Sequence, residues 1–234
     1  FSVGTSAVSN GNTENYVGWQ WKAGGTAVSN TAGTITSSVS ANTTAGFSVV
    51  TYTGTGANAT VGHGLGVVPG MVIIKSRSIR NWIVYHSSLT SAAYYLSLNQ
   101  TIAQSLVTTI FNSTAPTNAV FSIGTDASVN ASAETYVAYC WAPVAGYSAF
   151  GSYSGNGSTD GPFVYLGFRP AFVMVKARNQ IQSLWVILDD KRSEFNPMYD
   201  WLYPNTFGPE YSPSTSPSDF TSNGFKIRHS QIYF

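Results

Sequence analysis

The residues GLGVVPGMVIIK at positions 64–75 decide the fold, because they recur as YLGFRPAFVMVK at positions 165–176. The matching leucine, glycine, proline, valine and lysine positions are all 101 residues apart. Each copy ends in an apolar, β-branched run that follows a proline, a pattern typical of a β-strand after a turn. A period near 100 residues predicts tandem domains that each bury a core of their own.

The repeat extends outward from this stretch on both sides. The offset grows along the chain, as expected where loops of different length join strands of constant length. The matching segments are Tyr52–Gly56 with Tyr153–Gly157 at 101, Trp82–Val84 with Trp185–Ile187 at 103, and Phe121–Ile123 with Phe225–Ile227 at 104.

Strand signals dominate the first copy, and no segment holds a helical period over eleven or more residues. We therefore predict an all-β fold of tandem antiparallel β-sandwiches of the jelly-roll or lectin-like kind, with repeat 1 at 46–143 and repeat 2 at 144–234. Residues 24–45 are rich in Gly, Ser and Thr and are interpreted as a linker, although Thr34–Thr36 and Val39 could add an edge strand. The predicted strands are Phe47–Thr53, Met71–Lys75, Trp82–Tyr85, Tyr94–Leu98, Val120–Ile123 and Tyr136–Trp141.

A third, partial copy stands at the front of the chain. Residues 1–23 match 121–143 at an offset of 120, so they are expected to be the last two strands of a repeat whose body is absent. Repeat 2 has the opposite defect, because Phe234 comes just before the expected closing strand. Two interpretations remain open: the chain is an excerpt of a longer repeat protein, or one copy donates its first strand to the next.

Under strand donation the contact is head-to-tail and does not close, so it builds a filament. The donor-strand residues expected to make the assembly contact are Tyr16, Val17, Trp19 and Trp21. The open acceptor edge is expected near Phe225 and Ile227.

The composition excludes some classes of protein and favours others. Apolar residues make up 43% of the chain and aromatic residues 14%, enough for a packed core. Charged residues make up only 9% and the net charge is +1, so no long-range field attracts nucleic acid. No apolar run approaches the roughly 20 residues that span a bilayer, so we expect no membrane insertion.

The inventory of catalytic groups is thin. His63, His86 and His229 have no second ligand at metal-binding spacing, and no nucleophile, phosphate or dinucleotide motif is present. Asp189 and Asp190 could serve a glycosidase or bind Ca²⁺, but adjacent strand residues point to opposite faces, which favours a solvated turn. Cys140 is expected to be a buried structural thiol. We therefore predict a protein that is not an enzyme and has no metal or cofactor.

Carbohydrate binding is the rival function. Trp82 and Trp185 occupy equivalent strand positions and are interpreted as core residues. The aromatic side chains of the proline-rich stretch 195–218 are better candidates for an exposed sugar-stacking platform, and the candidates are Trp201, Tyr203 and Tyr211. Candidate N-glycosylation sites are Asn42, Asn58, Asn99, Asn112, Asn130 and Asn156.

Four phrases of the chain, taken together, carry a resemblance. They are residues 19–25 (WQWKAGG), 46–54 (GFSVVTYTG), the anchor at 64–75 and 112–117 (NSTAPT). As a set they resemble a family of uncharacterised repeat domains that are frequent in predicted tail-fibre and other virion structural proteins of aquatic bacteriophages. The resemblance covers nearly the whole chain and departs from the pattern only after Phe234.

The resemblance implies an extracellular or virion-surface location and a β-rich fibre role, and it offers no catalytic residues to carry over. We therefore expect a non-enzymatic structural subunit of an extracellular fibre or virion appendage. Its expected partners are other copies of itself or further fibre proteins. The alternative is a carbohydrate-binding receptor-recognition module of a phage tail fibre, whose partners would be surface glycans.

Overall fold

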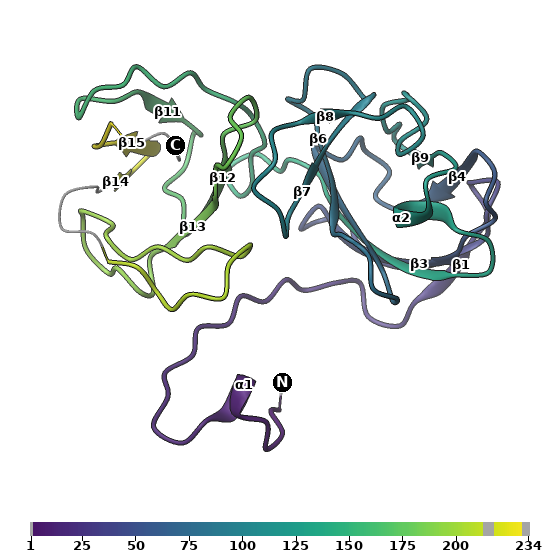
Figure 1. Cartoon of the computed structure of the whole chain (residues 1–234), viewed down its shortest axis with the longest axis horizontal. Coiled ribbons are helices and arrows are strands. Elements are labelled where there is room, and N and C mark those ends of the chain that lie inside the picture. Colours follow the sequence, from purple (N-terminus) through teal and green to yellow (C-terminus); the bar gives the residue numbers. More distant parts are fainter. Residues whose placement is uncertain (1, 213–217, 231–234) are drawn as a thin grey trace.

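The computed structural model describes residues 2–212 and 218–230. The chain is nearly all β-structure, with 33% in strands and 4% in helices, and its sheets are antiparallel. This confirms the predicted all-β, sandwich-type fold. Figure 1 shows two β-rich units side by side, with strands β1 to β10 in the first unit and β11 to β15 in the second. The first residues form a separate arm that carries helix α1.

The first unit contains one large sheet of eight strands in the order β1-β2-β3-β10-β5-β6-β7-β8 and a small sheet of β4 and β9. A short helix, α2, connects β9 to β10. The elements are β1 (Val28–Asn30), β2 (Ser37–Asn42), β3 (Phe47–Thr53), β4 (Ala59–Gly62), β5 (Met71–Ser76), β6 (Ile83–His86), β7 (Tyr94–Ser97), β8 (Ser105–Leu106), β9 (Val120–Ile123), α2 (Ala127–Asn130) and β10 (Thr135–Trp141).

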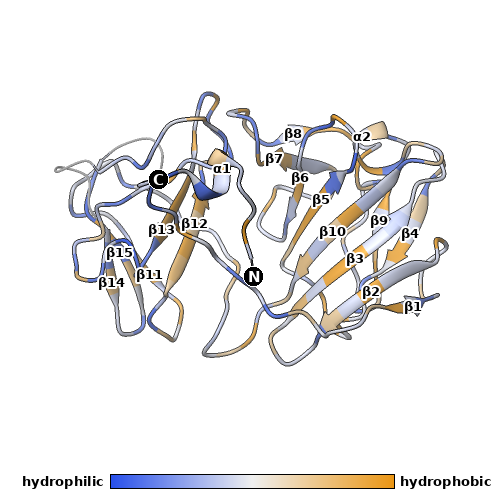
Figure 2. Cartoon of the chain, turned by 90° about the horizontal axis from the view of Figure 1, so that it is seen from below, coloured by the Kyte–Doolittle hydropathy of each residue, from blue (hydrophilic) through white to orange (hydrophobic). Residues whose placement is uncertain are grey.

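The two sheets of the first unit enclose a core. Alternate residues of the central strands face it, because successive strand side chains point to opposite faces. In β10, Tyr136, Ala138 and Cys140 are buried in this core, as are Val61 of β4 and Phe121 of β9. The large sheet therefore has one face packed on the β4–β9 pair. Figure 2 shows β3 and β10 beside each other, with orange apolar residues alternating with paler ones along both strands.

The second unit repeats part of this arrangement. Its elements are β11 (Phe163–Tyr165), β12 (Phe172–Lys176), β13 (Trp185–Asp189), β14 (Ser218–Thr221) and β15 (Gly224–Ile227). The β12–β13 pair reproduces β5–β6 in the same register, since Met174 lies opposite Ile187 as Ile73 lies opposite Val84. The β11–β15 pair corresponds to β4–β9 with a shift of two residues, since Phe121 lies opposite Val61 and Phe225 lies opposite Val164, not Pro162.

A third cluster of buried side chains joins the two units. Trp185 of β13 packs with Ile73, Val84 and Leu96, which point out of the large sheet on the face away from the first core. The indole Nε1 of Trp185 donates a hydrogen bond of 2.9 Å to the carbonyl oxygen of Ser97. Trp82 is half-buried at the edge of the same cluster, so the prediction of a core tryptophan is confirmed for Trp185 and not for Trp82.

The predicted strands of the first copy are all present, with bounds that differ by at most one residue at either end. The linker interpretation of residues 24–45 is wrong for the two parts of this segment that form strands. Strands β1 and β2 lie there, and β2 pairs with β3 along its length. Val39 and Ile35 are buried in the first core, so two apolar side chains were enough to bring a Gly/Ser/Thr-rich segment into the sheet.

Candidate assembly site

The amino-terminal arm, residues 2–23, is the segment of the chain with the least burial. Residues 2–10 and 12–16 are all exposed, including Val8 at 88% and Tyr16 at 51%. The arm holds the four-residue helix α1 (Ala7–Asn10) and no strand. The two strands expected there are therefore not formed within this chain.

The equivalent segment in the first unit shows how such a piece docks. The hydroxyl group of Tyr136 accepts a hydrogen bond from the backbone N–H of Ala131 and donates one to the carbonyl oxygen of Ala127, both at 2.7 Å. The Nδ2 group of Asn130 donates to the carbonyl oxygen of Gly124 at 2.8 Å. These bonds tie α2 to the start of β10.

The arm contains the same local structure while lying outside any sheet. The hydroxyl group of Tyr16 accepts from the N–H of Gly11 and donates to the carbonyl oxygen of Ala7, both at 2.7 Å. Asn10 Nδ2 donates to the carbonyl oxygen of Gly4 at 2.7 Å. Every one of these five residues lies 120 positions before its counterpart.

Backbone geometry repeats at the same spacing. Thr13 and Ala133 both adopt a positive φ, of 68° and 62°, which residues other than glycine rarely do. Ser6 caps α1 as Asp126 caps α2, each accepting a hydrogen bond from the backbone N–H two residues later. The arm therefore holds a preformed copy of the α2 corner, while the residues that correspond to β10 form no strand.

The second unit has the complementary feature. In the first unit β10 lies between β3 and β5 and pairs with both. In the second unit β12, the counterpart of β5, pairs with β13 on one side, and no described residue pairs with its other edge. Residues 149–154, which correspond to most of β3, form no strand. In the first unit β10 takes the position beside β5. In the second unit no described residue forms a strand at the corresponding position beside β12.

The residues predicted to form the acceptor edge do not lie at an open edge. Phe225 and Ile227 lie in β15, which pairs with β11 on one side and β14 on the other, and both side chains are buried. In the first unit β10 crosses to the other sheet after β9, so the corresponding edge in the second unit is the outer edge of β12.

The donor residues near the base of the arm already touch the second unit. The rings of Trp19 and Trp21 meet Phe172 of β12 edge-on, with centroids 5.8 and 5.5 Å apart. Trp21 also packs against Trp141 at the end of β10. Val17 is half-buried. The base of the arm is thus held at the junction of the two units, and the rest projects from it.

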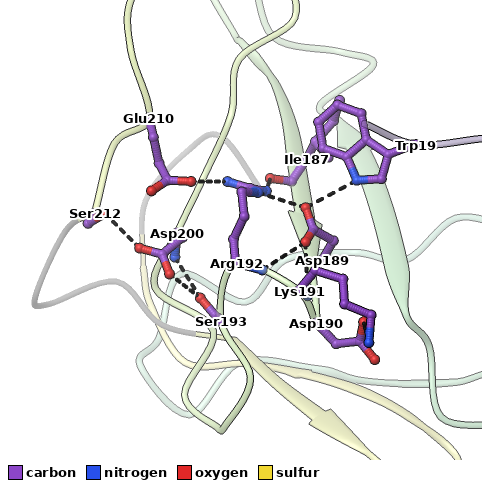
Figure 3. Close-up of polar contacts among 10 residues, drawn as sticks. All are labelled: Trp19, Ile187, Asp189, Asp190, Lys191, Arg192, Ser193, Asp200, Glu210 and Ser212. Carbon is purple, nitrogen blue, oxygen red and sulfur yellow. Dashed lines mark hydrogen bonds and ion pairs between the residues drawn. The ribbon is translucent and has the colours of Figure 1, made fainter. Parts of the chain in front are cut away.

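Trp19 also reaches the one dense charge cluster of the sequence (Figure 3). Its Nε1 donates to Asp189 Oδ2 at 3.2 Å, and the guanidinium carbon of Arg192 lies 5.9 Å from its ring centroid. Arg192 forms an ion pair with Asp189 at 2.7 Å and another with Glu210 at 3.0 Å. Burial opposes ionisation of Asp189, but hydrogen bonds from Arg192 outweigh it and lower the pKa of the carboxyl group.

The cluster does not form a catalytic pair. Asp189 is 2% exposed and its two oxygens accept four hydrogen bonds, so the expectation of a solvated turn is wrong for this residue. Asp190 turns away and pairs with Arg169 and Lys191. The cluster fixes the turn after β13 and the base of the arm.

The remaining candidate reactive groups are enclosed in the structure. His63 is buried, its Nδ1 accepts from the N–H of Leu65, and its Nε2 therefore donates to the carbonyl oxygen of Thr117. Burial raises the pKa of the Cys140 thiol to about 12, and the prediction of a buried thiol is confirmed. Within residues 2–212 and 218–230, no three His, Cys, Asp or Glu side chains come together to hold a metal ion.

The sugar-stacking platform is not present as predicted. Trp201 is fully buried in the core of the second unit, with the ring of Tyr203 at 6.4 Å and that of Tyr211 at 6.3 Å. A stacking platform requires an exposed ring face, and of the three candidates only Tyr211 is largely exposed, at 47%. Trp201 instead anchors the proline-rich stretch by packing in the core of the second unit.

One candidate glycosylation site is also excluded by burial. Asn130 is fully buried and its side chain bonds to Gly124, Ala57 and Thr55. Asn58, Asn99, Asn112 and Asn156 are exposed, and Asn42 is half-buried. Glycosylation at these five positions remains a prediction.

Sequence reasoning missed Tyr153, whose counterpart Tyr52 stacks on Tyr136 in the first unit. The signal that could have found it was present, since both tyrosines open the matching phrases 52–56 and 153–157.

Comparison with known proteins places the chain in one family. Residues 1–233 match a domain of unknown function, DUF7483, and the chain belongs to this family. No curated protein and no solved structure matches it. Among the described residues, no helix is long and apolar enough to cross a membrane.

Proposed function

We propose that the protein is a non-enzymatic structural subunit of a β-rich fibre, in which the arm of one copy completes the second unit of the next. Each copy then receives a strand at one end and supplies one at the other, so the contact repeats along an open filament. The observation that carries the proposal is the complementarity within one chain. The arm holds a preformed, exposed copy of the α2 corner followed by the sequence counterpart of β10, and no described strand pairs with the outer edge of β12 in the second unit.

Two further features support a fibre outside the cell or on a virion. Only 9% of residues are charged, so the surface is covered largely by neutral polar side chains, as is common in secreted and virion-surface β proteins. The phrases at 19–25, 46–54, 64–75 and 112–117 resemble repeat domains of predicted tail-fibre proteins. We place the protein in an extracellular fibre or virion appendage on these grounds.

Removal of residues 1–18 tests the proposal. This deletion removes α1 and the donor residues Tyr16 and Val17 but keeps Trp19 and Trp21, which pack on the body of the protein. We expect the full chain to form filaments by negative-stain electron microscopy, and the shortened chain to be monomeric by light scattering with an unchanged circular dichroism spectrum. Filaments that persist without residues 1–18 would contradict strand donation.

A further inference from the structure

We infer that the second unit holds a specific seat for the arm of a second copy, in which Tyr16–Trp21 pairs with β12 and the buried hydroxyl group of Tyr153 donates to the carbonyl oxygen of Ser9. The inference rests on the proposed function and adds the register, the contacts and the partner.

The register follows from the first unit. There Val137 lies opposite Lys75, Tyr139 opposite Ile73 and Trp141 opposite Met71. The offset of 120 leads from β10 to the arm, and the offset of 101 leads from β5 to β12. The pairs in the seat are therefore Val17 with Lys176, Trp19 with Met174 and Trp21 with Phe172.

Tyr153 of the second unit lacks two of the three contacts that its counterpart Tyr52 makes in the first unit. In the first unit the hydroxyl group of Tyr52 donates to the carbonyl oxygen of Val129 in α2 at 2.7 Å. Its ring stacks on Tyr136 with centroids 5.1 Å apart and planes at 13°. Its third contact is an edge-on approach to Phe121 at 6.2 Å.

Tyr153 keeps only the last of these contacts. Its ring meets Phe225 edge-on at 6.0 Å, as Tyr52 meets Phe121. Its hydroxyl oxygen is buried, yet no described residue bonds to it, and burial raises its pKa. Buried polar groups are nearly always hydrogen-bonded. An offset of 120 before Val129 identifies Ser9 as the arm residue whose carbonyl oxygen would take this bond, and Tyr16 as the ring that would stack on Tyr153.

The glycine at position 155 is consistent with the same docking position for the arm. A Cβ atom on Gly54 would lie 2.3 Å from the carbonyl oxygen of Ala131, so the close approach of α2 requires glycine there. The matching position in the second unit is also glycine, Gly155. The arm differs from β10 at two inward positions, where Gly18 replaces Ala138 and Gln20 replaces Cys140.

We assign the seat to a second copy because residues 2–10 and 12–16 of the arm are exposed in their own chain and no described residue bonds to the hydroxyl group of Tyr153. Trp19 and Trp21 at the base of the arm already contact Phe172 of β12, so a second arm would displace these two rings. Asn42 Nδ2 donates to the carbonyl oxygen of Lys22 at 3.2 Å, and Ser40 Oγ donates to that of Gly25 at 2.7 Å, which fixes the base of the arm on β2. Beyond this base, α1 and β11 lie on opposite sides of the second unit (Figure 1). Only Trp21 contacts β12 where the register places it.

Cysteine cross-linking tests the register and the partner. A chain with Val17→Cys is mixed with a differently sized, tagged chain with Lys176→Cys and oxidised, while the native Cys140 stays buried and unreactive. We expect a disulfide-linked dimer of the two chains on a non-reducing gel. The matched control pairs Val17→Cys with Met174→Cys, two residues out of register, and should link at least tenfold less. Equal linking of both pairs would overturn the register.

The double variant Val17→Cys/Lys176→Cys separates the two sources of the arm. Donation between copies gives a ladder of linked oligomers, whereas closure within one chain gives a linked monomer and overturns the assignment to a second copy. Absence of any link, in a protein whose filaments still require residues 1–18, would overturn the seat and leave the proposed function standing. Filaments that form without residues 1–18 would overturn both the seat and the proposed function.

Tyr153→Phe gives an independent test through the hydroxyl group. We expect it to weaken self-association about two- to tenfold, the usual effect of one hydrogen bond. It should not lower the melting temperature of the chain without residues 1–18, in which that bond is absent. Tyr52→Phe is the matched control and should lower that melting temperature, because it removes a bond made within the chain. Unchanged self-association in Tyr153→Phe would overturn the role of this residue.

Discussion

The hydroxyl group of Tyr136 shows how single residues organise this fold. It bridges two backbone groups at opposite ends of α2, so a four-residue helix, too short to be stable alone, becomes a fixed corner between β9 and β10. Tyr16 makes the same bridge in the arm. Because these contacts are local in sequence, the corner forms before any sheet receives it, which lowers the entropy lost when the strand docks.

His229 provides a residue-scale prediction about acid stability. Burial lowers the pKa of His229 from its ordinary value of 6.5 to about 4. Between these pH values the unfolded chain binds a proton that the folded chain does not, so stability falls as the pH decreases from about 6.5 towards 4. We expect the melting temperature to fall over this window, by about 2–4 °C for each kcal/mol lost.

His229→Gln removes this titration and is expected to flatten the pH dependence measured by differential scanning calorimetry. Burial also lowers the pKa values of His63 and His86, so a smaller dependence should remain. A variant with the same slope as the parent chain between pH 6.5 and 4 would show that His229 contributes nothing to it.

At the scale of elements, the positions of the strands could be predicted from the sequence, but the strands with which they pair in the sheet could not. Alternating apolar residues and turn punctuation located β3, β5, β9 and β10 to within a residue because those signals are local. The pairing of β10 with β3 and β5 depends on contacts between residues 60 to 94 positions apart, which local patterns do not encode. The acceptor edge was therefore predicted at β15, which lies between β11 and β14, whereas no described strand pairs with the outer edge of β12.

Composition misled in two places for a related reason. Residues 24–45 have the composition of a linker, yet Val39 and Ile35 are buried and bring β2 into the large sheet. The proline-rich stretch has the composition of an exposed loop, yet Trp201 is fully buried. In both cases a few large apolar side chains decide the location of a segment, because each buries far more area than its polar neighbours expose.

At the scale of the whole molecule, the two units are not independent domains, because a third cluster of buried side chains joins them. The cluster around Trp185 lies between them, and backbone bonds such as Gln104 N–H to the carbonyl oxygen of Arg178, at 2.7 Å, reinforce it. A filament built by strand donation would therefore bend at the contacts between copies and be stiff within each copy.

Trp185 gives the prediction that belongs to this scale. Truncation to alanine removes a ring that is 4% exposed, leaves a cavity between the units and abandons the hydrogen bond to Ser97. A change of this kind costs about 3–5 kcal/mol. We expect Trp185→Ala to separate the urea unfolding of the chain without residues 1–18 into two transitions, because the shared core that couples the units is lost.

Trp82→Ala is the matched control, since Trp82 is the repeat counterpart of Trp185 but lies half-buried at the edge of the same cluster. It should lower the midpoint less and keep a single transition. Trp185→Phe keeps most of the apolar area and loses the indole N–H, and is expected to cost about 1 kcal/mol while preserving cooperativity. If Trp185→Ala unfolds in one transition with an unchanged midpoint, the units are coupled by some other contact, and stiffness within a copy cannot be attributed to this core.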